Sequence, residues 1–355
     1  MCFNEIVVEY SDTIDGHHHL GMVVGTSSRE LIRRALPLDG DLQLLISAVE
    51  ESEDLKMRMR CYQQVLENQL PMIYAELQGM AEGAEVAFDT VFLSNYRKEV
   101  VPVDDKGCTD LHALGAWGHN EDYSWSVDFR PLTLLKATRV SAEGIRFTWF
   151  SVLYPLCLGG MTVGMNSGGV VFTLDNLTPR ECKGPECGSI SSQVVCRLAL
   201  ECCNIENLIS TVSDKRLATG RGFTCSSFSD PNILYIETGP GGVFAIQRNP
   251  SGHSNHYIYL DLHQKVSESS AHRLATINAL YTNLQTHNDI LKGLADTTDG
   301  EWPIFRTGKS PDKGYTDFTA LIDLHGKEML LYYKLPWVNG PVIPDKVIKF
   351  SSFSA

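Results

Sequence analysis

The sequence predicts a layered α+β fold with mostly antiparallel sheets. Helix-like and strand-like patterns are segregated into runs, in the order helices, strands, helices, strands. Such segregation is typical of α+β proteins, whereas regular alternation would predict a parallel sheet. The chain has 355 residues, of which 43% are hydrophobic, so it is long enough for a large core in one big domain or two ordinary ones.

The first run is helical, after a short strand-like segment at residues 5–9. Helical patterns cover residues 27–36, 42–80 and 88–100. Ser27 with Glu30 three residues later predicts a capped helix start. Pro71 suits the first turn of a new helix, where its missing N–H has no partner to lose.

Strand patterns follow a polar linker, VPVDDKG, at residues 101–107, which we expect to be flexible. From residue 108 to about residue 180, short alternating segments are separated by Gly or charged breaks. The longest apolar stretch, residues 147–165, contains Pro155 and paired glycines. It therefore predicts two buried strands with a turn and not a membrane helix.

The second half of the chain predicts helices and two hairpins. Expected elements are a helix pair at 190–212, a hairpin with a Gly-Pro-Gly-Gly turn at 226–249, helices at 265–297 and a hairpin at 315–335 that turns at His325–Gly326.

Charge and composition exclude several classes of function. The net charge is -13, and no Lys/Arg run exists to form a basic face, so we expect no nucleic-acid partner. The first residues, MCFNEIVVEY, have neither a basic region nor an apolar region of a secretory signal. We therefore expect a cytoplasmic protein without a membrane partner. An acidic protein is compatible with a cationic substrate.

The sequence predicts neither a metal site nor a cofactor. Ten cysteines are present, but Cys182 and Cys187 have no second pair at finger-like spacing, and disulfides are not expected in a reducing compartment. The run HHH at 17–19 reads as structural or loop, because adjacent side chains on a strand point to opposite faces. RTGKS at 306–310 lacks the first Gly of a P-loop, and no G-x-S-x-G motif occurs.

The pair Gly107–Cys108 suggests a cysteine nucleophile. A Cys nucleophile needs a base, and the sequence has no Cys-His signature of the papain or caspase type. If the Gly107–Cys108 bond is cut, the new α-amine of Cys108, with an ordinary pKa near about 8, can serve as that base. From this pair alone, a buried structural Cys that opens a strand remains the alternative.

Several motifs, in order, resemble one family over nearly the whole chain. These are GCTD, GHNEDYS, GMNSGGVVFTLDNL, SSQVVCRLALE and SNHYIY. They are similar to the penicillin acyltransferase family of self-processing N-terminal cysteine acyltransferases and amidohydrolases. The segment SVLYPLCLGGMTVGMNSGGVVFTLDNL most resembles the branch of N-β-alanyldopamine hydrolase, which removes β-alanine from an acylated biogenic amine.

The resemblance implies a fold and a processing event. The fold would be the four-layer αββα arrangement of N-terminal nucleophile hydrolases, with two stacked, mostly antiparallel sheets. Cleavage between Gly107 and Cys108 would give a helical α-chain, residues 1–107, and a β-chain, residues 108–355, which stay associated in one αββα domain.

The resemblance also implies roles for individual residues. Cys108 would be the nucleophile and Asp122 the active-site aspartate that holds the α-amine. Asn255 would donate to the oxyanion, a contact worth roughly 10²–10³ in rate. Arg306 would be a fixed cation that steadies Asp122 or a substrate group, and Ser226 a substrate-pocket residue.

The spacing of Cys108 and Asp122 departs from the family. The interval is fourteen residues, which shortens the hairpin by about four residues relative to the family pattern. Removal of an even number of residues keeps strand facing unchanged, so we expect Asp122 to point at Cys108 from the neighbouring strand.

The expected activity is hydrolysis of an N-acylated amine, for example a β-alanyl amine, through a Cys108 thioester. If an amine resolves the thioester in place of water, the same site is an acyltransferase. An unprocessed, non-catalytic binding protein is the second class of function. The expected partner is a small acylated amine, and a homo-oligomer is possible.

Overall fold

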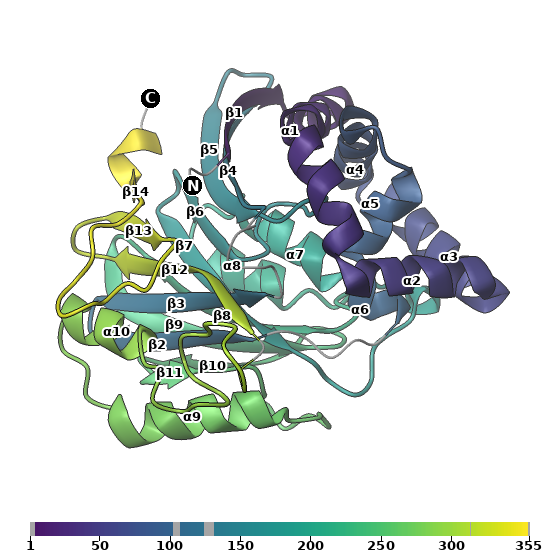
Figure 1. The fold of residues 1–355 in the computed structure, drawn as a ribbon. Helices are drawn as coiled ribbons and strands as arrows, with labels where there is room; N and C mark the ends of the chain where they lie inside the picture. Colours follow the sequence, from purple (N-terminus) through teal and green to yellow (C-terminus); the bar gives the residue numbers. More distant parts are fainter. Residues whose placement is uncertain (1–3, 102–106, 124–130, 313, 354–355) are drawn as a thin grey trace.

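The computed structural model describes residues 4–101, 107–123, 131–312 and 314–353, and shows two stacked sheets with helices on their outer faces (Figure 1). The eight-stranded sheet has the order β1 (Asn4–Ser11), β4 (Thr133–Val140), β5 (Arg146–Leu153), β6 (Val163–Asn166), β7 (Val170–Leu177), β8 (Gly220–Ser227), β9 (Asp230–Gly239) and β10 (Val243–Arg248). The six-stranded sheet has the order β11 (Gly252–His253), β2 (Cys108–Ala113), β3 (Ala116–Tyr123), β12 (Tyr315–Asp323), β13 (Glu328–Tyr332) and β14 (Lys346–Lys349).

The helices fall into two groups on opposite sides of this pair of sheets (Figure 1). The first group is α1 (Ile14–Ala35), α2 (Gly40–Glu51), α3 (Glu53–Gln69), α4 (Pro71–Ala84), α5 (Phe88–Asn95), α6 (Arg97–Val100), α7 (Ser192–Ala199) and α8 (Ile205–Val212). The second group is α9 (Glu268–Leu280) and α10 (His287–Leu294). The predicted α+β class is confirmed, and among the described strands every pairing except β1–β4 is antiparallel.

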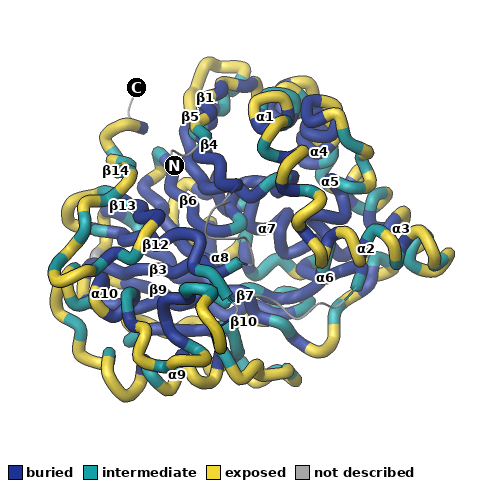
Figure 2. The backbone as a smooth tube through the Cα atoms, in the orientation of Figure 1, coloured by how far each residue is buried: buried dark blue, intermediate teal, exposed yellow. Residues whose placement is uncertain are grey.

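Three layers of buried apolar side chains hold the four structural layers together. The first, between the N-terminal helices and the eight-stranded sheet, includes Leu20, Leu77 and Trp149. The second, between the sheets, includes Trp117, Phe150 and Phe318, and the third, against α9 and α10, includes Leu111, Ile277 and Leu294. Figure 2 shows the strands of both sheets as mostly buried. The expected αββα layering is therefore present.

Helix α1 begins earlier than the sequence predicted. The expected start at Ser27 is wrong, because Thr13 is the N-cap and its side chain accepts a hydrogen bond from Gly16. The loop reading of the His17–His19 run is also wrong, since these residues lie inside α1. The glycines that weaken the helix signal here serve packing: a Cβ on Gly21 would lie 1.9 Å from the Glu76 carbonyl oxygen of α4.

Most other elements lie where the sequence predicted them. Pro71 is the first residue of α4, and the 190–212 helix pair corresponds to α7 and α8. The two hairpins are β9–β10 and β12–β13, and the long apolar stretch forms β5 and β6. Residues 102–106 of the predicted linker lie outside the described residues. Within the part of the chain that the structure describes, none of the helices has the length and apolar character needed to cross a membrane.

Candidate active site

Cys108 is the first residue of β2 and lines a cavity with about 890 Å³ of empty space, open mouth included. Both sides of the predicted cleavage point contribute to this cavity. Residues from the N-terminal helices are Asp41, Leu45, Ser94, Asn95, Arg97, Lys98 and Glu99; those after the cleavage point are Cys108, Glu121, Asp122, Tyr123, Met161, Leu174, Asn176, Ser191, Ser192, Gln193 and Arg221. The wall therefore depends on both expected chains.

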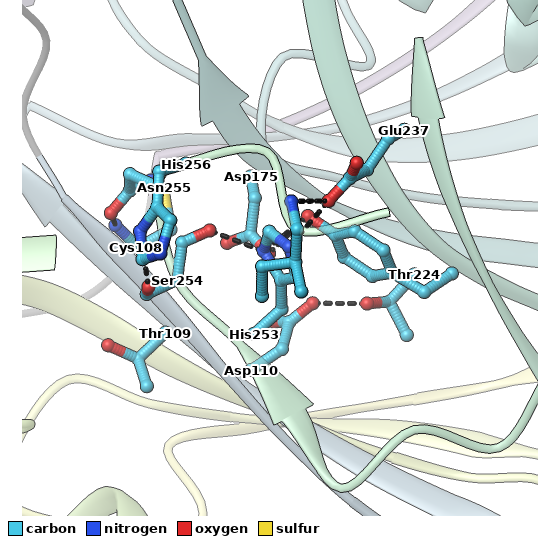
Figure 3. Close-up of polar contacts among 12 residues, drawn as sticks. Cys108, Thr109, Asp110, Asp175, Thr224, Glu237, His253, Ser254, Asn255 and His256 are labelled. Carbon is cyan, nitrogen blue, oxygen red and sulfur yellow. Dashed lines mark hydrogen bonds and ion pairs between the residues drawn. The ribbon is translucent and has the colours of Figure 1, made fainter. Parts of the chain in front are cut away.

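The register of the β2–β3 hairpin decides which side chains reach the thiol. Cys108 pairs with Glu121, and Asp110 pairs with His119. Directly paired residues of an antiparallel ladder project from the same face. This face looks toward the eight-stranded sheet, since the Asp110 carboxylate accepts a hydrogen bond from Thr224 of β8 (Figure 3).

Asp122 projects from the opposite face of β3, so the expectation that its side chain points at Cys108 is wrong. The cross-strand partner of the nucleophile is Glu121, one residue earlier. Asp122 is close to the Gly107–Cys108 bond through its backbone, because its N–H donates to the Gly107 carbonyl oxygen at 2.9 Å. Its carboxylate accepts a hydrogen bond of 2.7 Å from Thr316.

Burial raises the pKa of Asp122 to about 7. The positive charges of Arg273 and Arg306 act in the opposite direction and lower this pKa. One carboxylate oxygen, Oδ2, is buried without a hydrogen-bond partner among the described residues. Asp122 is thus a carboxyl group that can change its protonation state near neutral pH.

Asn255 is in direct contact with the backbone of Cys108. Its Oδ1 accepts hydrogen bonds from the Cys108 N–H at 2.8 Å and from Arg273 Nη2 at 2.6 Å, while its Nδ2 donates to the Asn176 carbonyl at 3.3 Å. Figure 3 shows Cys108 and Asn255 side by side. Arg273, on α9, also donates to the Cys108 carbonyl oxygen and was not anticipated from the sequence.

Arg306 is held rigidly beside this region. Its Nε donates to Asp312 at 2.7 Å and its Nη1 to Ser269 at 3.1 Å, so Asp312 is its direct partner. Its charge nevertheless contributes to the pKa of Asp122. Ser226 is placed differently: its hydroxyl, on β8, donates to the carbonyls of Asp230 and Asn232 on β9 at 2.8 and 2.7 Å. Among the described residues, the cavity wall does not include it.

The groups that contact the thiol are not among the site residues expected from the sequence. Cys108 Sγ lies 3.7 Å from Glu121 Oε2. His119 lies between two carboxylates, with Nε2 3.1 Å from Glu121 Oε2 and Nδ1 2.7 Å from Asp110 Oδ1. Residues 119 and 121 project from one face of the strand, and residues 120 and 122 from the other. If the hairpin register is counted from the tight turn at Gly115, residues 119 and 121 are the ones that share a face with Cys108.

The thiol is protonated at neutral pH in this environment. Burial, which is the largest cause, and the charge of Glu121 raise the pKa of Cys108 to about 12 against the opposing effect of His119. Burial also raises the pKa of Glu121, while hydrogen bonding to His119 lowers it. Activation of the sulfur therefore needs a proton acceptor close by.

In each of two sets of buried side chains, the possible ligand atoms lie close enough together to hold a metal ion. The two sets are Cys108–His119–Glu121 and Asp110–His119–Asp175. Both sets depend on the same imidazole, and each of its ring nitrogens already contacts a carboxylate oxygen. We therefore assign these side chains hydrogen-bonding roles.

A second buried polar group fixes the segment that carries Asn255. His253 Nε2 contacts Glu237 Oε1 at 3.0 Å (Figure 3). The Glu237 carboxylate accepts hydrogen bonds from the backbone N–H groups of residues 258, 259 and 260 at 2.8, 2.9 and 2.7 Å. The turn after β11 is thereby held in one conformation, and Asn255 with it.

A known protein family matches more than half of the chain. Residues 110–336 match the family described as acyl-coenzyme A:6-aminopenicillanic acid acyl-transferase. The chain belongs to this family. Membership makes it an enzyme of the acyltransferase and amidohydrolase kind, and the expected family is confirmed. Cys108 lies two residues before the matched segment.

Comparison with solved structures finds distant similarity. A C2A mutant of conjugated bile acid hydrolase from Clostridium perfringens has a TM-score of 0.43 and 9% identity, over 69% of this chain and 93% of that one. The N-acylethanolamine-hydrolyzing acid amidase ortholog of Caenorhabditis elegans has a TM-score of 0.40 and 10% identity, over 61% and 92%. No curated protein matches the chain.

Proposed function

We propose that this member of the acyltransferase family is a self-processing N-terminal-cysteine amidohydrolase. The observation that carries the proposal is the environment of the Gly107–Cys108 bond. The Asp122 N–H donates to its carbonyl oxygen, Asn255 accepts from its N–H, and Cys108 is one of the residues that line the cavity. A polarised carbonyl next to a thiol is suited to an N-to-S acyl shift.

Turnover then follows from the new N-terminus. The freed α-amine of Cys108 takes the thiol proton, and the sulfur attacks the amide carbonyl of the substrate. Asn255 lies beside Cys108, where its Oδ1 accepts from the Cys108 N–H and its Nδ2 donates to the Asn176 carbonyl, and in turnover the Nδ2 group donates to the tetrahedral oxyanion. The amine product leaves with a proton, and water hydrolyses the Cys108 thioester.

The cavity wall supports a short, polar acyl group such as β-alanyl. Glu99 is buried in this wall, and burial raises the pKa of its carboxyl group. A substrate ammonium would favour the ionised form of Glu99 and offset its cost of burial. Lys98 and Arg221 also line the cavity, and their positive charges lower the pKa of Glu99.

Acyl transfer is the second candidate, because the family to which the chain belongs is described by that activity. The first half-reaction is identical, and an amine acceptor would replace water at the thioester. Product analysis in the presence of added amines separates the two activities, since transfer gives a new amide and hydrolysis gives a free acid.

Intact mass spectrometry tests the proposal. Wild-type protein should give two co-purifying chains, residues 1–107 and 108–355, in place of one species of 39.4 kDa. Cys108→Ala should remain intact and inactive, and Cys108→Ser should process slowly. Purified protein should release amine from β-alanyl amides faster than from fatty-acyl amides. A wild-type chain that stays intact and forms no acyl-thioester with either panel would point to the binding-protein alternative.

A further inference from the structure

The intact chain lacks the base that the mature enzyme would use. Before cleavage, the nitrogen of Cys108 is an amide that donates to Asn255, so it cannot take a proton from the thiol. The burial that raises the thiol pKa to about 12 makes spontaneous ionisation rare at neutral pH. The first cut therefore needs a different proton acceptor.

Geometry leaves few acceptors beside the sulfur. Glu121 Oε2 accepts the S–H hydrogen bond at 3.7 Å. His119 has both ring nitrogens directed at carboxylate oxygens, and a neutral imidazole has only one N–H to donate. With both carboxylates ionised, His119 is an imidazolium that donates and has no lone pair for the thiol proton. Asp122 projects from the other face of β3.

We propose that Glu121 is the catalytic base for the self-cleavage of the intact chain, with His119 and Asp110 as its positioning residues. The inference rests on the proposed self-processing function and adds the group that starts it. Asp110 holds the imidazolium at 2.7 Å, and the imidazolium holds Glu121 Oε2 at 3.1 Å on the side of the sulfur.

Self-cleavage would proceed through a thioester between Gly107 and Cys108. The Cys108 thiol gives its proton to Glu121, and the sulfur forms a bond to the Gly107 carbonyl carbon. The C–N bond of the tetrahedral intermediate breaks, and Glu121 returns the proton to the departing nitrogen, which becomes the Cys108 α-amine. Water then hydrolyses the Gly107 thioester to give the Gly107 carboxylate and the free thiol.

The electrostatics of the site suit a carboxylate in this role. Burial raises the pKa of Glu121, which makes it a stronger base than an exposed carboxylate. The titratable and charged groups around it are Cys108 on β2, His119 and Asp122 on β3, Tyr154 after β5, Arg221 on β8 and, through Tyr154, Asp317 on β12. His119, Tyr154 and Arg221 lower its pKa, so a usable fraction stays ionised.

Glu121→Gln is the direct test. Cleavage of the full chain is measured by mass spectrometry during its cell-free synthesis. The substitution keeps the shape but removes the proton acceptor. Cleavage should slow by at least about 100-fold, in the range expected for loss of general base catalysis. Neutral hydroxylamine, which traps thioesters, should yield a Gly107 hydroxamate with wild type and none with Glu121→Gln. Cleavage of a folded Glu121→Gln chain at the wild-type rate would overturn the proposal.

The pH dependence distinguishes a base from a structural residue. Wild-type cleavage should rise with pH as Glu121 ionises and then level off, and Glu121→Gln should lack this inflection. The Tyr154 hydroxyl lies 2.9 Å from Asp317 Oδ2 and 3.3 Å from Glu121 Oε1, and its hydrogen bond lowers the pKa of Glu121. Tyr154→Phe should therefore raise the pKa of Glu121 and move the inflection to higher pH. An unchanged inflection in both variants would contradict the assignment. If Glu121→Gln folds poorly, an unchanged inflection in Tyr154→Phe alone would contradict it.

Two controls separate this inference from the proposed function. Glu143→Gln, at an exposed loop carboxylate, should cleave like wild type. Glu121→Asp keeps a carboxylate and should retain slow cleavage, whereas equal loss in the Asp and Gln variants would indicate a structural role. If wild type itself is never cleaved, the self-processing function fails. If wild type and Glu121→Gln are cleaved equally, only the role of Glu121 fails.

Discussion

The lack of a side chain at Gly107 allows two polar groups to approach the bond expected to be cut. A Cβ at this position would lie 2.6 Å from Arg273 Nη2 and 3.3 Å from Asn255 Oδ1. Arg273 cannot move freely, because it also donates to the Cys108 carbonyl and, at 2.8 Å, to Thr109. Glycine here thus permits the contacts that surround the scissile bond.

Replacement of Gly107 by Ala should therefore slow self-cleavage by about 10-fold or more, as a displacement of catalytic groups on the scale of 1 Å does. The uncleaved fraction over time, measured by mass, gives the rate. Gly40→Ala is the matched control, since a Cβ there meets no atom within 4 Å. Equal rates in the two variants would show that the close approach at Gly107 is not needed.

Asp122 gives a prediction about stability and pH. Its pKa in the folded state is about 7, above the ordinary value of 3.8, so the folded state binds the proton more tightly than the unfolded chain. The stabilising contribution of the protonated group is complete below about pH 4 and is lost as the pH rises to about 7. In a Cys108→Ala background, Asp122→Asn should flatten the fall in the free energy of unfolding across this window. Urea titrations at several pH values measure the free energy of unfolding. If its slope against pH is the same with and without Asp122→Asn, the proposed buried, proton-binding state of Asp122 is contradicted.

At the scale of elements, the β2–β3 hairpin decides the chemistry of the site. Its turn is two residues long, with Gly115 at a φ of +76°, and it places Glu121 opposite Cys108. A shift by one residue would send Glu121 to the outer face and bring Asp122 to the thiol. The family motif alone does not reveal this, because the motif fixes which residues occur and the turn fixes which face they occupy.

Gly115→Ala should destabilise the protein by more than the roughly 1–2 kcal/mol cost of a left-handed residue. Besides that strain, the new Cβ would lie 2.6 Å from His325 Nε2. Gly144→Ala is the matched control, because its φ is +78° and a Cβ there meets no atom within 4 Å. Urea unfolding of both variants in the Cys108→Ala background separates strain from contact. Equal losses would exclude a role for the His325 contact.

The sequence predicts elements well where pattern and local signals agree. The predicted change to strands after the linker is confirmed by β2, which begins at Cys108, and Pro71 begins α4 as expected. It fails for α1, where Gly21 and Gly25 oppose a helix locally but let α4 approach. It also fails for Arg273, whose role depends on the placement of α9 beside β2, a contact that no local pattern encodes.

At the scale of the whole molecule, the two expected chains interlock. Strand β1, from the N-terminal segment, pairs with β4 over eight residues, and both chains contribute to the same apolar layer. A buried ionic group crosses the same boundary. Glu76 accepts from Arg197 Nε at 2.9 Å and contacts His17 at 3.2 Å, while Arg197 also pairs with Glu201 at 2.8 Å. Cleavage after Gly107 would leave all of these contacts in place.

We therefore expect the cleaved chains to separate only when the fold is lost. Glu76→Gln removes one of the two carboxylates that pair with the fully buried Arg197. Because Glu201 still compensates part of the charge, the cost should be smaller than the roughly 3–5 kcal/mol of a buried charge left without a partner. The urea concentration at which residues 1–107 and 108–355 part, measured by size-exclusion chromatography, should fall accordingly. Glu30→Gln is the matched control: its pair with Arg33 is exposed, and such pairs contribute at most about 1 kcal/mol. If Glu76→Gln and Glu30→Gln dissociate at the same urea concentration, the apolar layer and the β1–β4 pairing hold the chains together without help from the ionic group.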